Sequence, residues 1–235
     1  FCPNCSPNCP YVDVFGLADS PIPTIAAVNG AAAGAGANIA LSCDVVIASE
    51  SAYFLQAFVN IGLVPDGGST WLLSRAIGRA RATRMMMLGE KIGASQAEDW
   101  GLIYKACDDD ALIGEARALA HKLANGPTLA YATMKKNIAT AMDGTITEVL
   151  LAEAEGQRLA GASKDAMEGG MAFLQKRKPD FKGEERHPDP RHSPDGGNPS
   201  TLAIDSKVIW TPACAGVTTY DLGLAEIIST TPDIS

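Results

Sequence analysis

The chain has 235 residues, of which 46% are hydrophobic and 20% charged, a composition typical of one globular domain or one domain with an appendage. Its formal net charge of −8 argues against general binding to nucleic acids or to anionic membranes. No apolar stretch reaches transmembrane length, and the first residues lack the pattern of a signal peptide. These observations predict a cytoplasmic enzyme that binds neither nucleic acid nor membrane.

The six cysteines are distributed unevenly along the chain. Cys2, Cys5 and Cys9 lie close together, but a thiolate metal site needs a fourth donor, and the usual second pair of ligands is absent. Cys43 lies inside an apolar run and is expected to be a small core residue. The sequence therefore predicts no metal site.

Three zones of the chain differ in composition. Residues 1–20 are rich in Pro, Asn and Cys and are predicted to be irregular, whereas residues 21–183 are dense in helix and strand patterns. Residues 184–235 begin with a turn-rich, linker-like segment and are predicted to be a disordered or non-native tail.

Strands and helices alternate in the first half of the middle zone. In chain order, the predicted elements are a buried strand at 24–28, a helix at 35–42, a buried strand at 45–48, a short strand or loop at 52–58, a loop at 61–69, a helix capped by Ser69 or Thr70 that ends near 76, and a helix at 79–88.

Helices dominate the second half. The predicted elements are a short helix opened by a capping box of Ser95 and Glu98, a strand at 102–107, a helix capped by Asp109 or Asp110, a helix after Pro127, a helix from a capping box of Thr145 and Glu148 to 159, and a helix at 163–175. Alternation first and helices afterwards predict an α/β fold with a helical C-terminal part.

The turn Gly34-Ala35-Gly36 has no side chain larger than a methyl group and stands at a predicted helix start. Such a turn lets a ligand approach free backbone N–H groups, so Ala35 is a candidate oxyanion donor. The alternative is tight packing of helix on strand, and the local pattern does not decide between the two.

Asp66 lies in a Pro/Gly loop, VPDGGS, whose small residues would admit a substrate. A carboxylate near Phe58, Leu63, Val64 and Trp71 would be suited to proton transfer. The alternative is an ordinary solvated turn aspartate or helix cap.

Four segments together resemble the crotonase, or enoyl-CoA hydratase/isomerase, superfamily: AAVNGAAAGAGANIALSCDVVIAS, IGLVPDGGSTWLLSRAIGRARA, SQAEDWGLI and EGGMAFLQKRKPDF. The resemblance implies a ββα spiral core at 21–110 and a helical trimerisation region at 111–183. It also implies a spiral that is incomplete at the N-terminus, with 1–20 as an irregular remnant. The family's N-terminal region supplies the first oxyanion N–H and much of the CoA pocket.

By this resemblance, Ala35 takes the place of the second oxyanion-hole N–H. The two glutamates that hydratases use to activate water fall on Asn38 and Phe58, which disfavours a classical hydratase. Asp66 matches the acidic position that isomerases use as a proton shuttle. The segments VPDGGSTWLL and GAGAN are most similar to isomerases of phenylacetate catabolism.

The expected function is therefore acyl-CoA isomerisation, of an epoxyphenylacetyl-CoA or of an enoyl-CoA double bond. The expected substrate-binding residues are Gly34, Gly36, Leu55, Phe58, Val64, Gly67 and Trp71, and those expected to approach CoA are Phe173 and Lys176. No cofactor is expected beyond the CoA of the substrate, and the chain is expected to form a homotrimer or hexamer. Two alternatives stay open: an enoyl-CoA hydratase, and a catalytically inert assembly partner that uses helices within 112–175.

Overall fold

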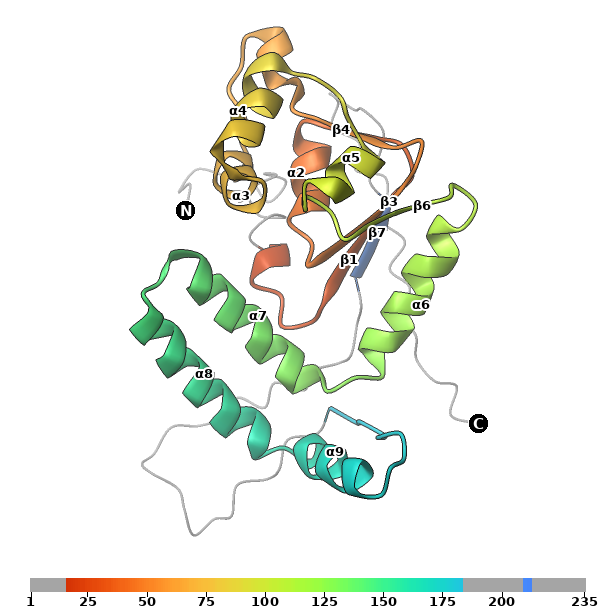
Figure 1. Cartoon of the computed structure of the whole chain (residues 1–235), viewed down its shortest axis with the longest axis vertical. Helices are drawn as coiled ribbons and strands as arrows, with labels where there is room; N and C mark the ends of the chain where they lie inside the picture. The colour runs from red at the N-terminus through yellow and green to blue at the C-terminus, as the bar shows by residue number, and fades with distance from the viewer. Residues whose placement is uncertain (1–15, 184–208, 213–235) are drawn as a thin grey trace. The chain divides into compact units, whose positions relative to one another are not determined.

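A computed structural model of the chain describes residues 16–183 and 209–212 (Figure 1). They fall into two compact units, of which the first contains residues up to Ala120 together with 209–212, and the second begins at His121. The three clustered cysteines and most of the predicted tail lie outside the described residues.

The first unit is built on a parallel sheet with the strand order β6-β3-β1-β7. Its strands are β1 (Thr24–Val28), β3 (Val45–Ser49), β6 (Lys105–Cys107) and β7 (Ile209–Pro212). All five residues of β1 are buried, as expected for a parallel strand covered on both faces. The predicted strands at 24–28 and 45–48 are confirmed.

The predicted strand at 102–107 is too long, because only its last three residues pair with β3. Leu102 instead donates its N–H to the carbonyl of Ala97 and closes the turn after the preceding helix.

A second, smaller sheet consists of β2 (Ala31–Ala33), β4 (Tyr53–Leu55) and β5 (Ile92–Gly93). β2 runs parallel to β4, whereas β5 runs antiparallel to it. Neither β2 nor β5 is predicted from the sequence, because β2 contains only alanine, β5 is only two residues long, and pairing with β4 selects the extended conformation in both.

Helices follow the strands of the first unit. They are α2 (Ala35–Leu41), the 3-10 helix η1 (Ala57–Ile61), α3 (Ser69–Ala76), α4 (Gly78–Leu88), α5 (Ala94–Asp99) and α6 (Leu112–Ala124). Phe54, Leu73 and Met85 are fully buried in the core between these helices and the sheets. Cys43 is buried in the same core, as predicted.

Three of the predicted side-chain caps are wrong. α5 begins two residues earlier than expected, at Ala94, so that Ser95 lies inside the helix and Gly93 precedes it. α3 likewise follows Gly68 and has no side-chain cap. α6 begins at Leu112, so Ala111 precedes it rather than Asp109 or Asp110, and the Asp109 carboxylate instead accepts the N–H of Ser51 at 3.1 Å.

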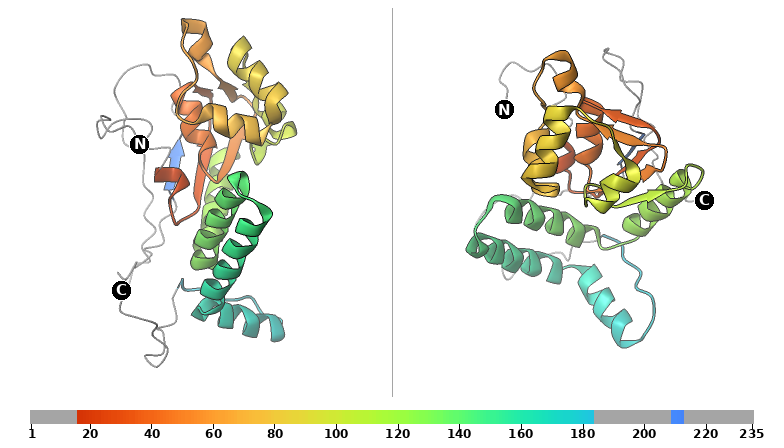
Figure 2. Two further views of the ribbon diagram at one scale, coloured as in Figure 1. Left: turned by 90° about the vertical axis from the view of Figure 1, so that its left-hand side faces the viewer. Right: turned by 45° about the horizontal axis from the view of Figure 1, so that its top comes forward.

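The second unit contains the end of α6 from His121 onward, followed by α7 (Thr128–Asp143), α8 (Ile146–Gly161) and α9 (Lys164–Leu174). α7 and α8 lie side by side as a hairpin in both views of Figure 2. The capping box of Thr145 and Glu148 at the start of α8 is confirmed.

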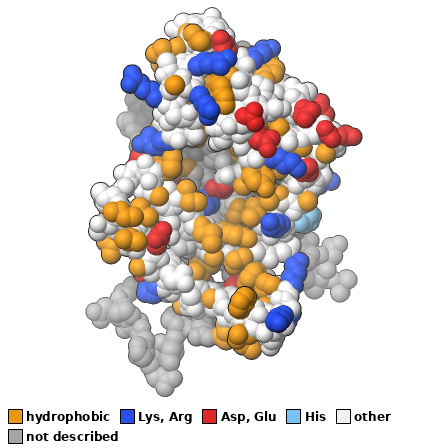
Figure 3. Space-filling view, in the orientation of Figure 1, with side chains coloured by type: hydrophobic (Ala, Val, Ile, Leu, Met, Phe, Trp, Pro, Cys, Tyr) orange, Lys and Arg blue, Asp and Glu red, His pale blue; other side chains and the backbone are white. Residues whose placement is uncertain are grey.

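Several large apolar side chains on these helices are exposed, and Figure 3 shows hydrophobic side chains gathered over this part of the surface. They include Ile138, Ile146, Leu150, Leu151, Phe173 and Leu174. In the part of the chain that the structure describes, no helix combines the length and the apolarity needed to cross a membrane.

Candidate active site

The Gly/Ala turn joins β2 to α2 and exposes a backbone donor. Gly34 has a φ of 54°, a left-handed conformation that glycine adopts without strain, and its N–H donates to the carbonyl of Leu55 at 2.9 Å. Its own carbonyl accepts the N–H of Asn38 at 3.2 Å, the first bond of the helix. Ala35 and Gly36 are the first two residues of α2, and their N–H groups have no acceptor among the described residues.

Phe58 lies against this turn. A Cβ added to Gly34 would stand 3.7 Å from the ring of Phe58, which is ordinary van der Waals contact. The structure therefore brings together two of the predicted substrate-binding residues, with the Ala35 donor adjacent in the chain.

The loop that carries Asp66 is held by its backbone. The peptide carbonyl of Asp66 accepts hydrogen bonds from Asn38 Nδ2 at 2.8 Å, from Ser69 Oγ at 2.8 Å and from Ser69 N at 3.1 Å. Gly67 and Gly68 follow with φ of 55° and 77°, a left-handed pair that turns the chain into α3. Since Asn38 lies one helical turn after Gly34, its side chain ties this loop to the helix that starts with Ala35.

The carboxylate of Asp66 is not used for folding. Its Oδ1 is buried and has no hydrogen-bond partner among the described residues. Leaving a buried acceptor unpaired costs about 1–3 kcal/mol, and more for a charged group, so native proteins contain few such groups and a catalytic role is one explanation for them. Asp66 as a whole is half-buried, and a carboxylate with an unpaired oxygen can take up and return a proton.

Of the other predicted substrate-binding residues, Gly67 is buried and Leu55 is half-buried, whereas Val64 and Trp71 lie in open surroundings. Val64 is 80% exposed, and Trp71 is 44% exposed with the guanidinium of Arg75 over its ring at 4.4 Å. Among the described residues neither is enclosed, so their part in an acyl pocket stays a prediction.

The residues predicted to approach CoA belong to the second unit, at the end of α9. The side chain of Phe173 is 83% exposed, and Lys176 has a left-handed φ of 52° where the chain leaves the helix. Their contact with CoA also stays a prediction.

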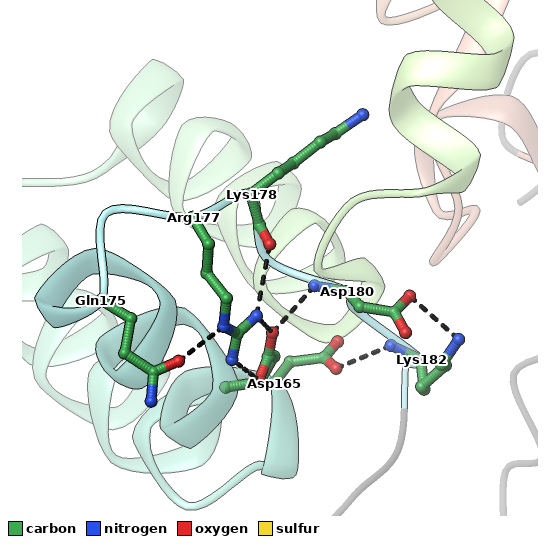
Figure 4. Close-up of polar contacts among 7 residues, drawn as sticks. Asp165, Gln175, Arg177, Lys178, Asp180 and Lys182 are labelled. Carbon is green, nitrogen blue, oxygen red and sulfur yellow. Dashed lines mark hydrogen bonds and ion pairs between the residues drawn. The ribbon is translucent and has the colours of Figure 1, made fainter.

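The segment after α9 folds back onto the helix (Figure 4). Arg177 forms two hydrogen bonds with the carboxylate of Glu168, which also accepts the N–H of Asp180 at 3.0 Å. Together they lower the pKa of Glu168 to about 2. These bonds hold the strap formed by residues 175–183 in place.

The end of this strap is held by a buried acid. Asp165 accepts the N–H groups of Lys182 at 2.8 Å and Gly183 at 3.0 Å. A cavity of about 250 Å³ lies within the second unit, lined mainly by small and apolar residues of α7, α8, α9 and the strap, including Leu129, Ala160, Ala166, Gly169 and Phe181. Asp165 is the charged residue of this lining, and backbone N–H groups occupy both of its oxygens.

Metal ligands do not converge in the described residues: no group of three or more His, Cys, Asp or Glu side chains could hold an ion there. The cluster of Cys2, Cys5 and Cys9 lies outside the described part of the chain.

Two residues of the site gain a role that the sequence analysis missed. Asn38 holds the Asp66 loop, and Gln56 donates to Asn38 Oδ1 at 2.9 Å. A signal exists in the sequence, because an asparagine within the apolar helix 35–42 must find hydrogen-bond partners if it is buried.

The chain belongs to the enoyl-CoA hydratase/isomerase family, also called the crotonase superfamily, whose family model matches residues 13–184. The crystal structure of an enoyl-CoA hydratase from Polaromonas sp. JS666 superposes with a TM-score of 0.71 at 36% identity, covering 74% of this chain and 67% of that one. The predicted α/β crotonase fold with C-terminal helices is thereby confirmed.

Two curated relatives differ in their named activities. The chain is 49% identical to the 1,2-epoxyphenylacetyl-CoA isomerase of Escherichia coli strain K12 over 168 residues, which are 72% of this chain and 64% of that protein. It is 50% identical to a "Probable enoyl-CoA hydratase" of Rhodobacter capsulatus over 163 residues, which are 69% of this chain and 63% of that protein. The chain thus spans less than two thirds of the length of these relatives.

Proposed function

We propose that the chain is an acyl-CoA isomerase of this family, with Asp66 as its acid and base and the N–H of Ala35 as an oxyanion donor. The observation that carries the proposal is the buried, unpaired Oδ1 of Asp66. The similarity to the E. coli isomerase supports an epoxyphenylacetyl-CoA or an enoyl-CoA as substrate. CoA itself is the carrier of the acyl group, and no further cofactor is needed.

A double-bond shift needs one proton to leave one carbon and to return to another. The Asp66 carboxylate removes a proton from the γ-carbon of a 2-enoyl thioester, and the electrons of that bond move through the double bond onto the thioester oxygen. The N–H of Ala35 stabilises this oxyanion, a contribution of about 2.7–4 kcal/mol for one such donor. The Asp66 carboxylic acid then returns the proton to the α-carbon, and the carbonyl re-forms.

Hydration is the second candidate, because a relative named as a probable hydratase is equally similar. The residues at the two water-activating positions argue against it. The amide of Asn38 cannot act as an acid or base, and both of its polar atoms are engaged by Asp66 and Gln56. Phe58 has no polar atom in its side chain. Addition of water to crotonyl-CoA by the purified chain would favour hydration.

The test of the isomerase proposal is Asp66→Asn, which keeps the size of the side chain and removes its basicity. Isomerisation of epoxyphenylacetyl-CoA or of an enoyl-CoA should fall by about 100-fold or more, the contribution of a positioned acid–base group. The matched control is Asp99→Asn at an exposed position of α5, which should leave turnover unchanged. Full turnover in the Asp66 variant would exclude the proton shuttle. If wild-type chain shows no heat of binding with any acyl-CoA, the inert assembly partner is favoured.

We further propose that the chain assembles as a homotrimer or hexamer through its C-terminal helices. The exposed apolar side chains of α7, α8 and α9 support this assignment, because contiguous apolar surface of this kind marks contact sites.

A further inference from the structure

The side chain of Asn38 is the polar link between α2 and the loop that carries Asp66. Asn38 is 2% exposed, and a polar group at such burial nearly always has at least one hydrogen-bond partner. Its Nδ2 donates to the peptide carbonyl of Asp66 at 2.8 Å, and its Oδ1 accepts from Gln56 Nε2 at 2.9 Å.

We propose that Asn38 is a positioning residue for Asp66: it fixes the backbone from which the carboxylate projects and so sets where the proton is taken and returned. This inference rests on the proposed role of Asp66 as acid and base. Asn38 acts through the peptide carbonyl and leaves the carboxylate itself unpaired. The residue thereby places the group without competing with a substrate for it.

Gln56 determines which way the Asn38 amide faces. Its side chain is completely buried, and its Nε2 donates to Asn38 Oδ1, so Nδ2 must face Asp66. Its own Oε1 has no partner among the described residues. The one hydrogen bond that its side chain makes there therefore serves to orient Asn38.

The loop is seated closely against this amide. A Cβ added to Gly67 would stand 3.3 Å from Asn38 Nδ2, closer than about nine in ten real Cβ contacts, and 3.5 Å from Asn38 Cβ. Gly67 also has a φ of 55°. The absence of a side chain at Gly67 is what allows the Asp66 carbonyl to reach Asn38.

The test is Asn38→Asp, which keeps the shape and the acceptor toward Gln56 but turns an oxygen toward the carbonyl of Asp66. We expect kcat for the isomerisation to fall by about 100-fold, the effect of a misplacement of about 1 Å, with KM nearly unchanged. The control is Asn125→Asp, because Asn125 Nδ2 also donates to a backbone carbonyl, that of His121, at 2.7 Å on an exposed surface. The control should leave both kinetic constants unchanged.

A double-variant comparison separates positioning from general damage. In an Asp66→Asn background, Asn38→Asp should cause little further loss, because its effect passes through the carboxylate that is already absent. An equal loss in both backgrounds, or unchanged kcat in Asn38→Asp alone, would overturn the proposal. If Asn38→Asp fails to fold, Gln56→Met frees the amide instead and should lower kcat by about fivefold, the loss of one neutral hydrogen bond.

A measurement independent of turnover distinguishes this proposal from that of the proton shuttle. Hydrogen exchange of the Ser69 amide, which donates to the Asp66 carbonyl at 3.1 Å, should accelerate in Asn38→Asp. The Gly101 amide, bonded to the Glu98 carbonyl at 2.8 Å, serves as the internal reference. If Asp66→Asn keeps full turnover, the shuttle is wrong, and unchanged exchange at Ser69 would then overturn the positioning role as well.

Discussion

Replacing Gly156 with alanine should affect the stability of the protein in two opposite ways, through helix propensity and through packing against α7. Gly156 lies buried within α8, and a glycine inside a helix normally lowers stability. Replacing it with alanine would gain about 1 kcal/mol of helix propensity. The added Cβ, however, would overlap Thr133 Cγ2 on α7 and come within 3.3 Å of Asn137 Nδ2.

Thr133 cannot move aside freely. Its Oγ1 donates to the carbonyl of Leu129 at 2.9 Å, so rotation about the Cα–Cβ bond would break a hydrogen bond with a net value of about 0.5–1.5 kcal/mol. Overpacking at such a helix contact costs typically about 1–3 kcal/mol. These costs exceed the propensity gain, and we expect Gly156→Ala to lower the free energy of unfolding by about 1–3 kcal/mol.

Urea unfolding followed by circular dichroism measures this change through the transition midpoint. Gly114→Ala is the matched control, because Gly114 lies inside α6 with nothing within 4 Å of an added Cβ, and it should gain about 0.5–1 kcal/mol. Adding Thr133→Ser to Gly156→Ala removes Cγ2 and keeps Oγ1, and should restore the stability. If Gly156→Ala is as stable as the wild type, the reasoning from helix contact is refuted.

Two further predictions concern the oxyanion donor and the strap. Ala35→Pro removes the N–H at the first position of α2, where proline is tolerated. Turnover should fall by about 100-fold or more while acyl-CoA still binds. Full turnover in a folded variant would exclude Ala35 as an oxyanion donor. Arg177→Gln should lower the urea midpoint at pH 7. Because the pKa of Glu168 is depressed to about 2 from 4.5, the stabilisation is present above pH 4.5 and is lost as pH falls through about 2. The midpoints of variant and wild type should therefore converge near pH 2, and a constant difference would contradict the assignment.

Helices and strands are predicted well from the sequence where neighbouring residues alone determine them, as in apolar runs and local caps. The strand at 24–28 and the capping box of Thr145 and Glu148 follow from neighbouring residues, and both are confirmed. The pattern of Ser95 and Glu98 looks the same in sequence, yet Glu98 there accepts the N–H of Ala106 at 2.9 Å. Ala106 belongs to β6, so the spacing of Ser95 and Glu98 alone cannot predict this hydrogen bond.

The candidate site is predicted in part for the same reason. Ala35 and Asp66 can be identified from the sequence because each lies in a local Gly-rich turn with a family resemblance. The bond from Asn38 to Asp66 joins residues 28 positions apart, and the bond from Gln56 to Asn38 joins residues 18 apart. Their pairing depends on how α2, η1 and the loop pack, so it requires the structure.

Hydrogen bonds fix the backbone of Asp66 but not its carboxylate. Three donors fix its carbonyl, while its carboxylate accepts no hydrogen bond from the described residues. The side chain of Asp66 can still rotate about its Cα–Cβ and Cβ–Cγ bonds, and these rotations move the carboxylate oxygens while the backbone stays in place. Such rotations take picoseconds to nanoseconds, far faster than loop motion. If Asp66 is the acid and base that we propose, this rotation would let its carboxylate reach two carbons of one bound substrate without movement of the loop.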